Sequence, residues 1–241
     1  MVPDGGGSVT TRPRRNAVQR DPGLPRTRKG LETRERLIDA ATSMVNRLGY
    51  QDLRLADIAA EADVPSSLIY RYFKGKPQIV LAALTRLRDE VQDVLAADSA
   101  GAAFDRILDK NRRIIDLYAR NPGLLRCIIA FGGDEPEFQQ LFREMSQRWN
   151  QAVARSIARQ FPDLTLGEGE RLMLAHALCS MVDNFVYECL VLRSPLLAPV
   201  FAEDRDDMAL FVSLLWHRAL YLCDPPTDRL GRFAGLTGFH L

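Results

Sequence analysis

The stretch 49–76, GYQDLRLADIAAEADVPSSLIYRYFKGK, decides the fold of this 241-residue chain. Two short helices of about eight residues each fit into it, joined by a tight turn at 62–65. In the first helix, Leu55, Ile58 and Ala62 share one apolar face. In the second, Ile69 and Phe73 lie one turn apart, while hydroxyl, tyrosine and basic side chains point elsewhere. This pattern predicts a helix-turn-helix whose second helix enters the major groove of DNA.

The distribution of charge agrees with a DNA-binding head. Residues 1–76 carry 14 Lys and Arg against 9 Asp and Glu, whereas the remainder carries 18 against 22. Positive charge therefore gathers where phosphates would bind. Residues 1–29 are rich in Gly, Pro and Arg and cannot bury enough apolar surface to fold. We expect a disordered basic arm, which either adds phosphate or minor-groove contacts or serves only as a solubilising leader.

The remaining sequence predicts helices and no strands. Apolar stripes indicate a helix from 31 that ends at Gly49, one from 77 to 97, and others over 104–118, 124–130 and 138–153. Asp134 is a plausible cap for the last of these. Thr165 and Glu168 form a capping box that opens a long helix to 193, and a final helix covers 206–222. We therefore expect an all-α fold with an arm at 1–29, a head at 30–76, a larger helical domain at 77–224 and an irregular tail at 225–241.

Catalysis and metal binding find little support in the sequence. The histidines His176, His217 and His240 are not spaced with other ligands as in known metal sites. No nucleophile elbow, phosphate-binding glycine loop or HExxH motif occurs. The four cysteines form no CxxC pair and are expected to be buried, reduced thiols. We expect neither an enzyme nor a cofactor or metal. No apolar run approaches about 18 residues and no secretory signal is present, so we also expect a cytoplasmic protein without a membrane partner.

Residues 31–77 resemble the DNA-binding domain of the tetracycline-repressor (TetR) family of bacterial regulators. The matching elements keep the family's spacing and are Gly49-Tyr50, Asp57-Ile58-Ala59, Ala62, Val64, Tyr70, Tyr72-Phe73 and Lys76. The resemblance implies a homodimer joined by a four-helix bundle of the last two long helices. It also implies a palindromic double-stranded operator and a small apolar or amphipathic effector that binds in the C-terminal domain and releases the regulator, most simply a repressor.

The resemblance assigns roles within the head as well. The expected DNA-binding residues are Arg54, Ser66, Ser67, Tyr70, Arg71, Lys74 and Lys76. The two serines and Arg71 would face the groove, and Arg71 suits a bidentate contact to guanine. The other four would bind phosphates.

Three positions depart from the family's pattern. Asp63 stands where Gly is usual, at a turn residue expected to have positive φ, which Asp tolerates. Pro65 replaces the usual Ser or Thr cap of the recognition helix, and Arg54 replaces a usual Thr or Ser. These changes bear on base preference more than on DNA binding itself.

A polar stripe crosses the long helix at 167–193, which is otherwise apolar around most of its circumference. Its members recur at i, i+4, i+7 and i+11 and are His176, Ser180, Asp183 and Tyr187. The stripe either lines an effector cavity, with aromatic walls from Tyr118, Phe131, Phe138 and Trp149, or forms a hydrogen-bonded seam in the core or across a dimer. A second functional hypothesis is a helical small-molecule-binding or interaction protein with a vestigial DNA-binding head.

Overall fold

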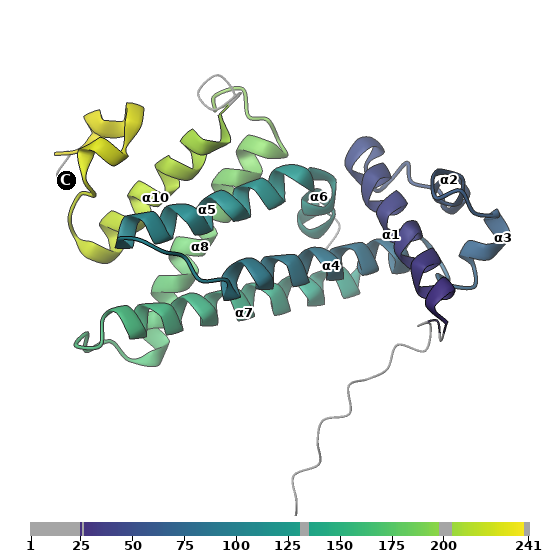
Figure 1. The fold of residues 1–241 in the computed structure, drawn as a ribbon, viewed down its shortest axis with the longest axis horizontal. Coiled ribbons are helices and arrows are strands. Elements are labelled where there is room, and N and C mark those ends of the chain that lie inside the picture. The colour runs from purple at the N-terminus through teal and green to yellow at the C-terminus, as the bar shows by residue number, and fades with distance from the viewer. Residues whose placement is uncertain (1–24, 26, 131–134, 198–203, 239–241) are drawn as a thin grey trace, which may run out of the picture.

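The computed structural model describes residues 25, 27–130, 135–197 and 204–238, which form helices joined by short turns (Figure 1). No strand occurs within these ranges, and the all-α prediction is confirmed. The head contains α1 (Arg28–Leu48), α2 (Leu55–Glu61) and α3 (Ser66–Ile69). The body contains α4 (Lys76–Ala96), α5 (Ala103–Arg120), α6 (Pro122–Ala130), α7 (Pro136–Gln160), α8 (Glu168–Leu190) and α10 (Arg205–Tyr221).

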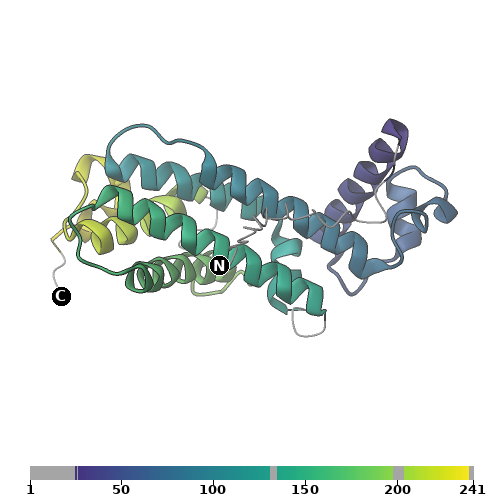
Figure 2. The same ribbon diagram turned by 90° about the horizontal axis from the view of Figure 1, so that it is seen from below.

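The molecule is elongated, with the head at one end. Figure 2 shows α4 and α7 running side by side along the long axis, and these two helices are in contact. α4 starts at the head and reaches deep into the body, so a boundary at residue 77 falls inside its first turn. The helix therefore belongs mechanically to both parts.

The start of α1 differs from the prediction. The Thr27 side chain accepts a hydrogen bond from the Gly30 backbone N–H at 3.1 Å, as an N-cap residue does. α1 consequently begins at Arg28, inside the segment expected to be a disordered arm. Of that arm, residues 1–24 and 26 lie outside the described residues. The helix ends as expected at Gly49, whose φ of 83° is one that glycine adopts without strain.

The recognition helix is shorter than the predicted eight residues. α3 covers only Ser66–Ile69, and the chain continues in tighter turns through Tyr72. The backbone N–H of Phe73 donates to the Ile69 carbonyl at 2.9 Å, which brings the buried Phe73 ring back under the helix. The backbone N–H groups of Arg71 and Tyr72 donate to carbonyls three residues earlier, so the regular α-helix ends at Ile69.

Several body elements also differ from their predicted ends. The proposed cap Asp134 lies outside the described residues, and α7 begins at Pro136. The predicted box at Thr165 and Glu168 is wrong: Gly167 is the N-cap of α8, and Glu170 accepts its backbone N–H at 2.5 Å. The tail is not irregular. Its short 3₁₀ helices η1 (Thr227–Arg229) and η2 (Gly231–Leu236) bury Leu230 and Phe233 against α5 and α10.

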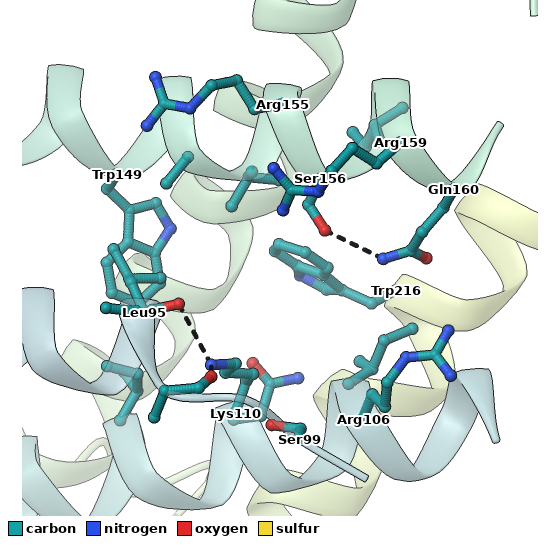
Figure 3. A pocket seen from close by; sticks show the side chains of 18 of the residues that line it. Leu95, Ser99, Arg106, Lys110, Trp149, Arg155, Ser156, Arg159, Gln160 and Trp216 are labelled. Atoms are coloured by element: carbon teal, nitrogen blue, oxygen red, sulfur yellow. Dashed lines mark hydrogen bonds between the residues drawn. The ribbon is translucent and has the colours of Figure 1, made fainter. Parts of the chain in front are cut away.

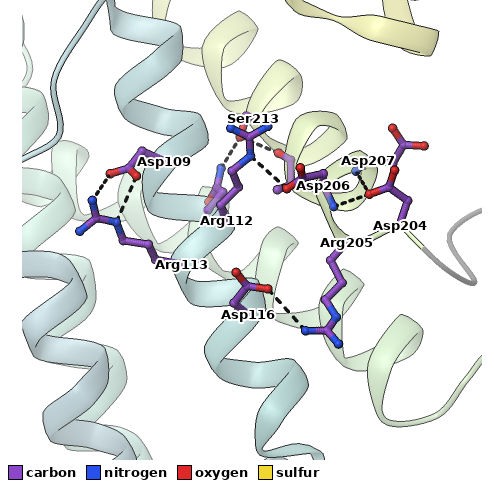
Figure 4. Close-up of polar contacts among 11 residues, drawn as sticks. Asp109, Arg112, Arg113, Asp116, Asp204, Arg205, Asp206, Asp207 and Ser213 are labelled. Atoms are coloured by element: carbon purple, nitrogen blue, oxygen red, sulfur yellow. Dashed lines mark hydrogen bonds and ion pairs between the residues drawn. The ribbon is translucent and has the colours of Figure 1, made fainter.

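The far end of the body depends on the pairing of α5 with α10. The buried Asn111 side chain donates to the Ser213 hydroxyl at 2.9 Å, which satisfies two polar groups inside this seam (Figure 4). Around it, exposed ion pairs join Arg112 to Asp206 at 3.1 Å and Arg205 to Asp116 at 3.5 Å. Exposed pairs contribute little, so the apolar contacts carry most of the stability of this seam.

The head and the body share one hydrophobic core. A single cluster of buried side chains runs from Leu37 of α1 through α4 to Leu141 of α7. Tyr50 lies at the junction, where its ring packs edge-on against Phe138 at 5.7 Å and its hydroxyl donates to Glu135 at 2.6 Å. The head is therefore packed against the body rather than tethered to it.

A close backbone approach fastens the same junction. Gly123, at the start of α6, donates its N–H to the Asn46 side chain of α1 at 2.9 Å. The same Asn46 donates to the Arg120 carbonyl at 3.0 Å. A Cβ at position 123 would meet the Val45 carbonyl and would lie 2.7 Å from Asn46 Cα. Only glycine fits between these two helices.

We expect Gly123→Ala to destabilise the protein by about 1–3 kcal/mol, because the added methyl must push α6 away from α1. The measurement is the free energy of unfolding from urea denaturation. Gly235→Ala is the matched control, since a Cβ there meets nothing within 4 Å. A Gly123→Ala variant as stable as the Gly235→Ala control would contradict this packing.

Candidate DNA-binding surface and effector pocket

The helix-turn-helix presents the expected groove-facing side chains to solvent. Ser66 and Ser67 open α3 and are exposed, and neither hydroxyl is engaged by another described residue. Arg71 follows the helix, is exposed and forms no ion pair within the described part of the chain. Tyr70 beside it is 62 % exposed. Much of this aromatic ring is therefore accessible to a partner.

The turn before α3 is held by a residue that the sequence analysis did not single out. Asp63 has a φ of 52°, which confirms the expected left-handed turn residue. Arg36 of α1 donates to the carbonyls of Ala62 and Asp63, the second at 3.1 Å, and pairs with the Asp63 carboxylate at 3.8 Å. Nothing in the local pattern reveals this contact, because Arg36 and Ala62 are 26 residues apart in the sequence.

The expected phosphate-binding cations divide into free and engaged groups. Arg54 is the N-cap residue of α2, and its exposed side chain makes no capping bond. Lys74 is exposed between α3 and α4, and its ammonium has no partner among the described residues. Lys76 is different: its Nζ donates to the Tyr50 carbonyl at 2.9 Å and the Gln51 carbonyl at 3.1 Å. It also lies 4.5 Å from the centre of the Tyr50 ring. Lys76 therefore stabilises the loop before α2.

A pocket of about 730 Å³ opens in the body, far from the head. Its walls come from the end of α4, the start of α5, the C-terminal half of α7 and part of α10 (Figure 3). Trp149 of α7 and Trp216 of α10 present their rings to it. This size and this mixture of aromatic and polar walls are typical of small-molecule sites.

Comparison with known proteins identifies the head. Residues 37–83 match the family model described as bacterial regulatory proteins, tetR family. The head therefore matches the DNA-binding domain of the TetR family. The chain is 26 % identical over 158 residues to the HTH-type transcriptional regulator BetI of Cronobacter sakazakii, covering 63 % of this chain and 76 % of that protein. It is 29 % identical over 99 residues to the HTH-type transcriptional repressor KstR of Mycolicibacterium smegmatis, covering 40 % of this chain and 48 % of that protein.

The fold extends the likeness beyond the head. A tetR-family transcriptional regulator from Streptomyces coelicolor superposes with a TM-score of 0.61 at 21 % identity, covering 85 % of this chain and 97 % of that one. The head is thus similar to the DNA-binding domain of TetR-family transcriptional regulators, and the chain has the fold of a solved TetR-family regulator. Within its described residues, no cluster of three potential metal ligands exists. None of the helices in those ranges has the length and apolar character to cross a bilayer.

The structure does not bring the predicted effector residues together. Trp149 lines the pocket, but Tyr118 and the four stripe residues of α8 do not. Phe138 has no accessible surface and packs against Tyr50 at the head junction, so it cannot line a cavity. Phe131 lies outside the described residues. The basic pocket residues that the sequence analysis missed had a signal in the sequence: Arg148, Arg155 and Arg159 recur at i, i+7 and i+11 of α7.

The polar stripe of α8 instead marks an open face of that helix. His176, Ser180 and Asp183 are exposed, together with Met173, and Tyr187 is half-buried. On the stripe's α7 side, His176 Nδ1 hydrogen-bonds the Asn150 side chain at 2.9 Å. Cys127 and Cys179 are buried as predicted, whereas Cys189 is half-buried and Cys223 is exposed beyond the end of α10.

Asp183 is the unusual member of this stripe. The residue as a whole is exposed, yet its carboxylate points inward and accepts a hydrogen bond from the Tyr118 hydroxyl of α5. Desolvation raises the pKa of Asp183 to about 6, although the hydrogen bond from Tyr118 acts in the opposite direction. Burial and the neighbouring carboxylate raise the pKa of Tyr118 well above its ordinary value, so the phenol stays protonated as a donor.

The raised pKa gives Asp183 a defined effect on stability. An unfolded Asp ionises near pH 3.9, whereas the folded one keeps its proton up to about pH 6. The folded state binds more protons in this window, so the contribution of Asp183 to stability falls as pH rises from about 4 to 6. We expect Asp183→Asn to lack this loss, since the amide retains the hydrogen bond without the charge. Urea unfolding at pH 4.5 and 7 measures the difference.

Asp163→Asn provides the background for that comparison, because it removes an exposed carboxylate in the turn between α7 and α8. Relative to this control, Asp183→Asn should gain stability over the wild type at pH 7 and little at pH 4.5. A gain that is the same at both pH values would show that Asp183 does not titrate in this range.

Proposed function

We infer that this regulator is a homodimeric repressor that leaves a palindromic operator when an amphipathic small molecule enters the body pocket. The inference rests on one observation. A continuous hydrophobic core connects the exposed, basic DNA-binding surface of the head with a pocket at the other end of α4. Ligand binding in such a body has a mechanical route to the head.

The DNA contacts follow from which side chains the fold leaves free. Arg71, Ser66 and Ser67 are exposed at α3 and would reach base edges in the major groove. Arg54 and Lys74 lie at the ends of the motif, are exposed and have no competing ion pair among the described residues. They would neutralise phosphates and set the register. Lys76 contributes indirectly, because its Nζ already holds two carbonyls.

The open face of α8 supports a dimer. Met173 is 74 % exposed there, next to the exposed Ala177, His176 and Ser180. A long helix that is apolar around most of its circumference is normally covered on more than one side. A second copy of α8 would cover this face and would place the polar stripe in the seam between subunits. This assignment replaces the cavity interpretation of the stripe.

Coupling requires that the ligand prefer one conformation of the body. The pocket is walled by the C-terminal end of α4 and by α7, while the other end of α4 packs in the head. A ligand that separates α4 from α7 would tilt α4 and, through the α1–α6 contact, the whole head. In a dimer, a tilt of both heads changes the distance between the recognition helices, which the spacing of the half-sites fixes.

Selection from a random-sequence DNA pool tests the function. We expect the wild type to enrich an inverted repeat with half-site centres about 34–36 Å apart, or a multiple of that distance. Arg71→Ala should lose about 1–3 kcal/mol of preference for the selected sequence. Lys74→Ala should weaken binding to all sequences alike and lower the slope of log K against log salt by about 0.9.

Arg143→Ala removes an exposed cation from α7 and serves as the control, with DNA binding unchanged. Sedimentation should give twice the chain mass of 27.1 kDa. Equal affinity of the wild type for selected and random DNA would favour the alternative, a binding protein with a vestigial head.

A further inference from the structure

The pocket wall formed by α7 carries a row of unpaired arginines. Arg148, Arg155 and Arg159 all line the pocket, and at about 100° per residue they fall within about 40° of one another. All three are exposed, and none has an ion pair or hydrogen bond within the described residues. Figure 3 shows Arg155 and Arg159 along one side of the hollow. Like charges one helical turn apart repel, so this row is not explained by helix stability.

The other charges of the pocket are already used by the fold. Lys110 Nζ donates to the carbonyls of Val94, at 2.7 Å, and Leu95, which end α4. Arg106 donates to the Gly101 carbonyl at 2.7 Å. Asp98 is the one acidic residue among the described pocket-lining residues. The free charge in the pocket is therefore positive and lies on α7.

The two tryptophans give the same pocket an apolar part. The Trp216 indole N–H donates to the Leu178 carbonyl at 3.2 Å, and the Trp149 indole N–H contacts the Cys179 sulfur. Because their polar atoms are bound to α8, the rings turn apolar surface toward the hollow. An apolar group beside them would be removed from water.

A third observation concerns Gln92 of α4. It lines the pocket, and its side-chain Nε2 is buried without a hydrogen-bond partner. A buried donor without an acceptor is costly and uncommon in folded proteins. Arginines and a lone amide donor have the same requirement, which is a ligand rich in hydrogen-bond acceptors.

We propose that this pocket binds an amphipathic organic anion. Its acidic group pairs with Arg155 and Arg159, and its apolar body lies between Trp149 and Trp216. Arg guanidinium groups bind carboxylate and phosphate in the same forked geometry, so either acid satisfies the site. This assignment rests on the proposed function, for which it names the class of effector.

The test uses the full chain and four probes with the same apolar body, kept below their micelle concentrations: decanoate, decyl phosphate, decanol and decyltrimethylammonium. The chain has two tryptophans and both line this pocket, so tryptophan fluorescence reports on it directly. We expect both anions to bind about tenfold or more tightly than the alcohol and the cation. The difference between decanoate and decyl phosphate tells a carboxylate ligand from a phosphate ligand.

Variants locate the acidic group. Arg155→Gln combined with Arg159→Gln should lower the affinity for the anions about tenfold or more and leave that for decanol within about twofold. The matched control is Arg143→Gln, an exposed arginine of α7 that does not line the pocket. Both variants change surface arginines, and their unfolding temperatures should match that of the wild type.

Three results would overturn the proposal: no preference for anions, no binding of any probe, or equal loss in the control. The proposed function fails separately, in the DNA selection. If the protein bound an operator specifically and a neutral or cationic ligand released it, the proposed repressor function would stand. Only the proposal of an anionic effector would then be wrong.

Discussion

The contact between α1 and α6 is the constraint on which the rest of the structure depends. Gly123 places its backbone against the end of α1, and Asn46 satisfies polar groups on both sides of the gap. A few residues along the chain, Tyr50 adds an aromatic contact and a hydrogen bond to the start of α7. Without these contacts the head would hang on α4 alone. With them, the DNA-binding surface has one orientation for each arrangement of the body.

This arrangement is the basis of the proposed coupling between the pocket and the DNA-binding surface. The pocket lies at the distal end of α4, where α5, α7 and α10 meet, and the same helix supplies part of the core of the head. A packed core shifts between discrete arrangements rather than bending gradually. In the proposed mechanism, a ligand that changes the pairing of α4 with α7 therefore moves α4 and the head together.

The sequence predicted the head well because local rules determine it. Helical periodicity located α1 and α2, Gly49 ended the first helix, and Asp63 adopted the positive φ expected of its position. Contacts between distant segments were not predictable. Three such contacts depend on the tertiary fold: the hydrogen bonds from Arg36 to the turn, those from Lys76 to the carbonyls of residues 50 and 51, and the packing of Leu230.

The proposed effector site likewise has one part that the sequence shows and another that only the fold shows. The arginine row of α7 is visible in the sequence at spacings of seven and four, but such rows are common on solvated helix faces. Only the fold places this row opposite Trp216 and the end of α4. Conversely, the stripe from His176 to Tyr187 has the spacing of a cavity wall, yet His176, Ser180 and Asp183 are exposed and do not line the pocket. Spacing identifies a shared face, and the neighbours of that face decide its role.

Amide hydrogen exchange measures the central claim, that head and body form one cooperative unit. If they share a core, the slowest amides of α1, within residues 37–45, should open with the same free energy as those of α5, to within about 1 kcal/mol. Exchange of α1 faster by about a hundredfold or more, with α5 still protected, would mean that the head unfolds alone. Such a result would contradict the mechanical link between the pocket and the DNA-binding surface.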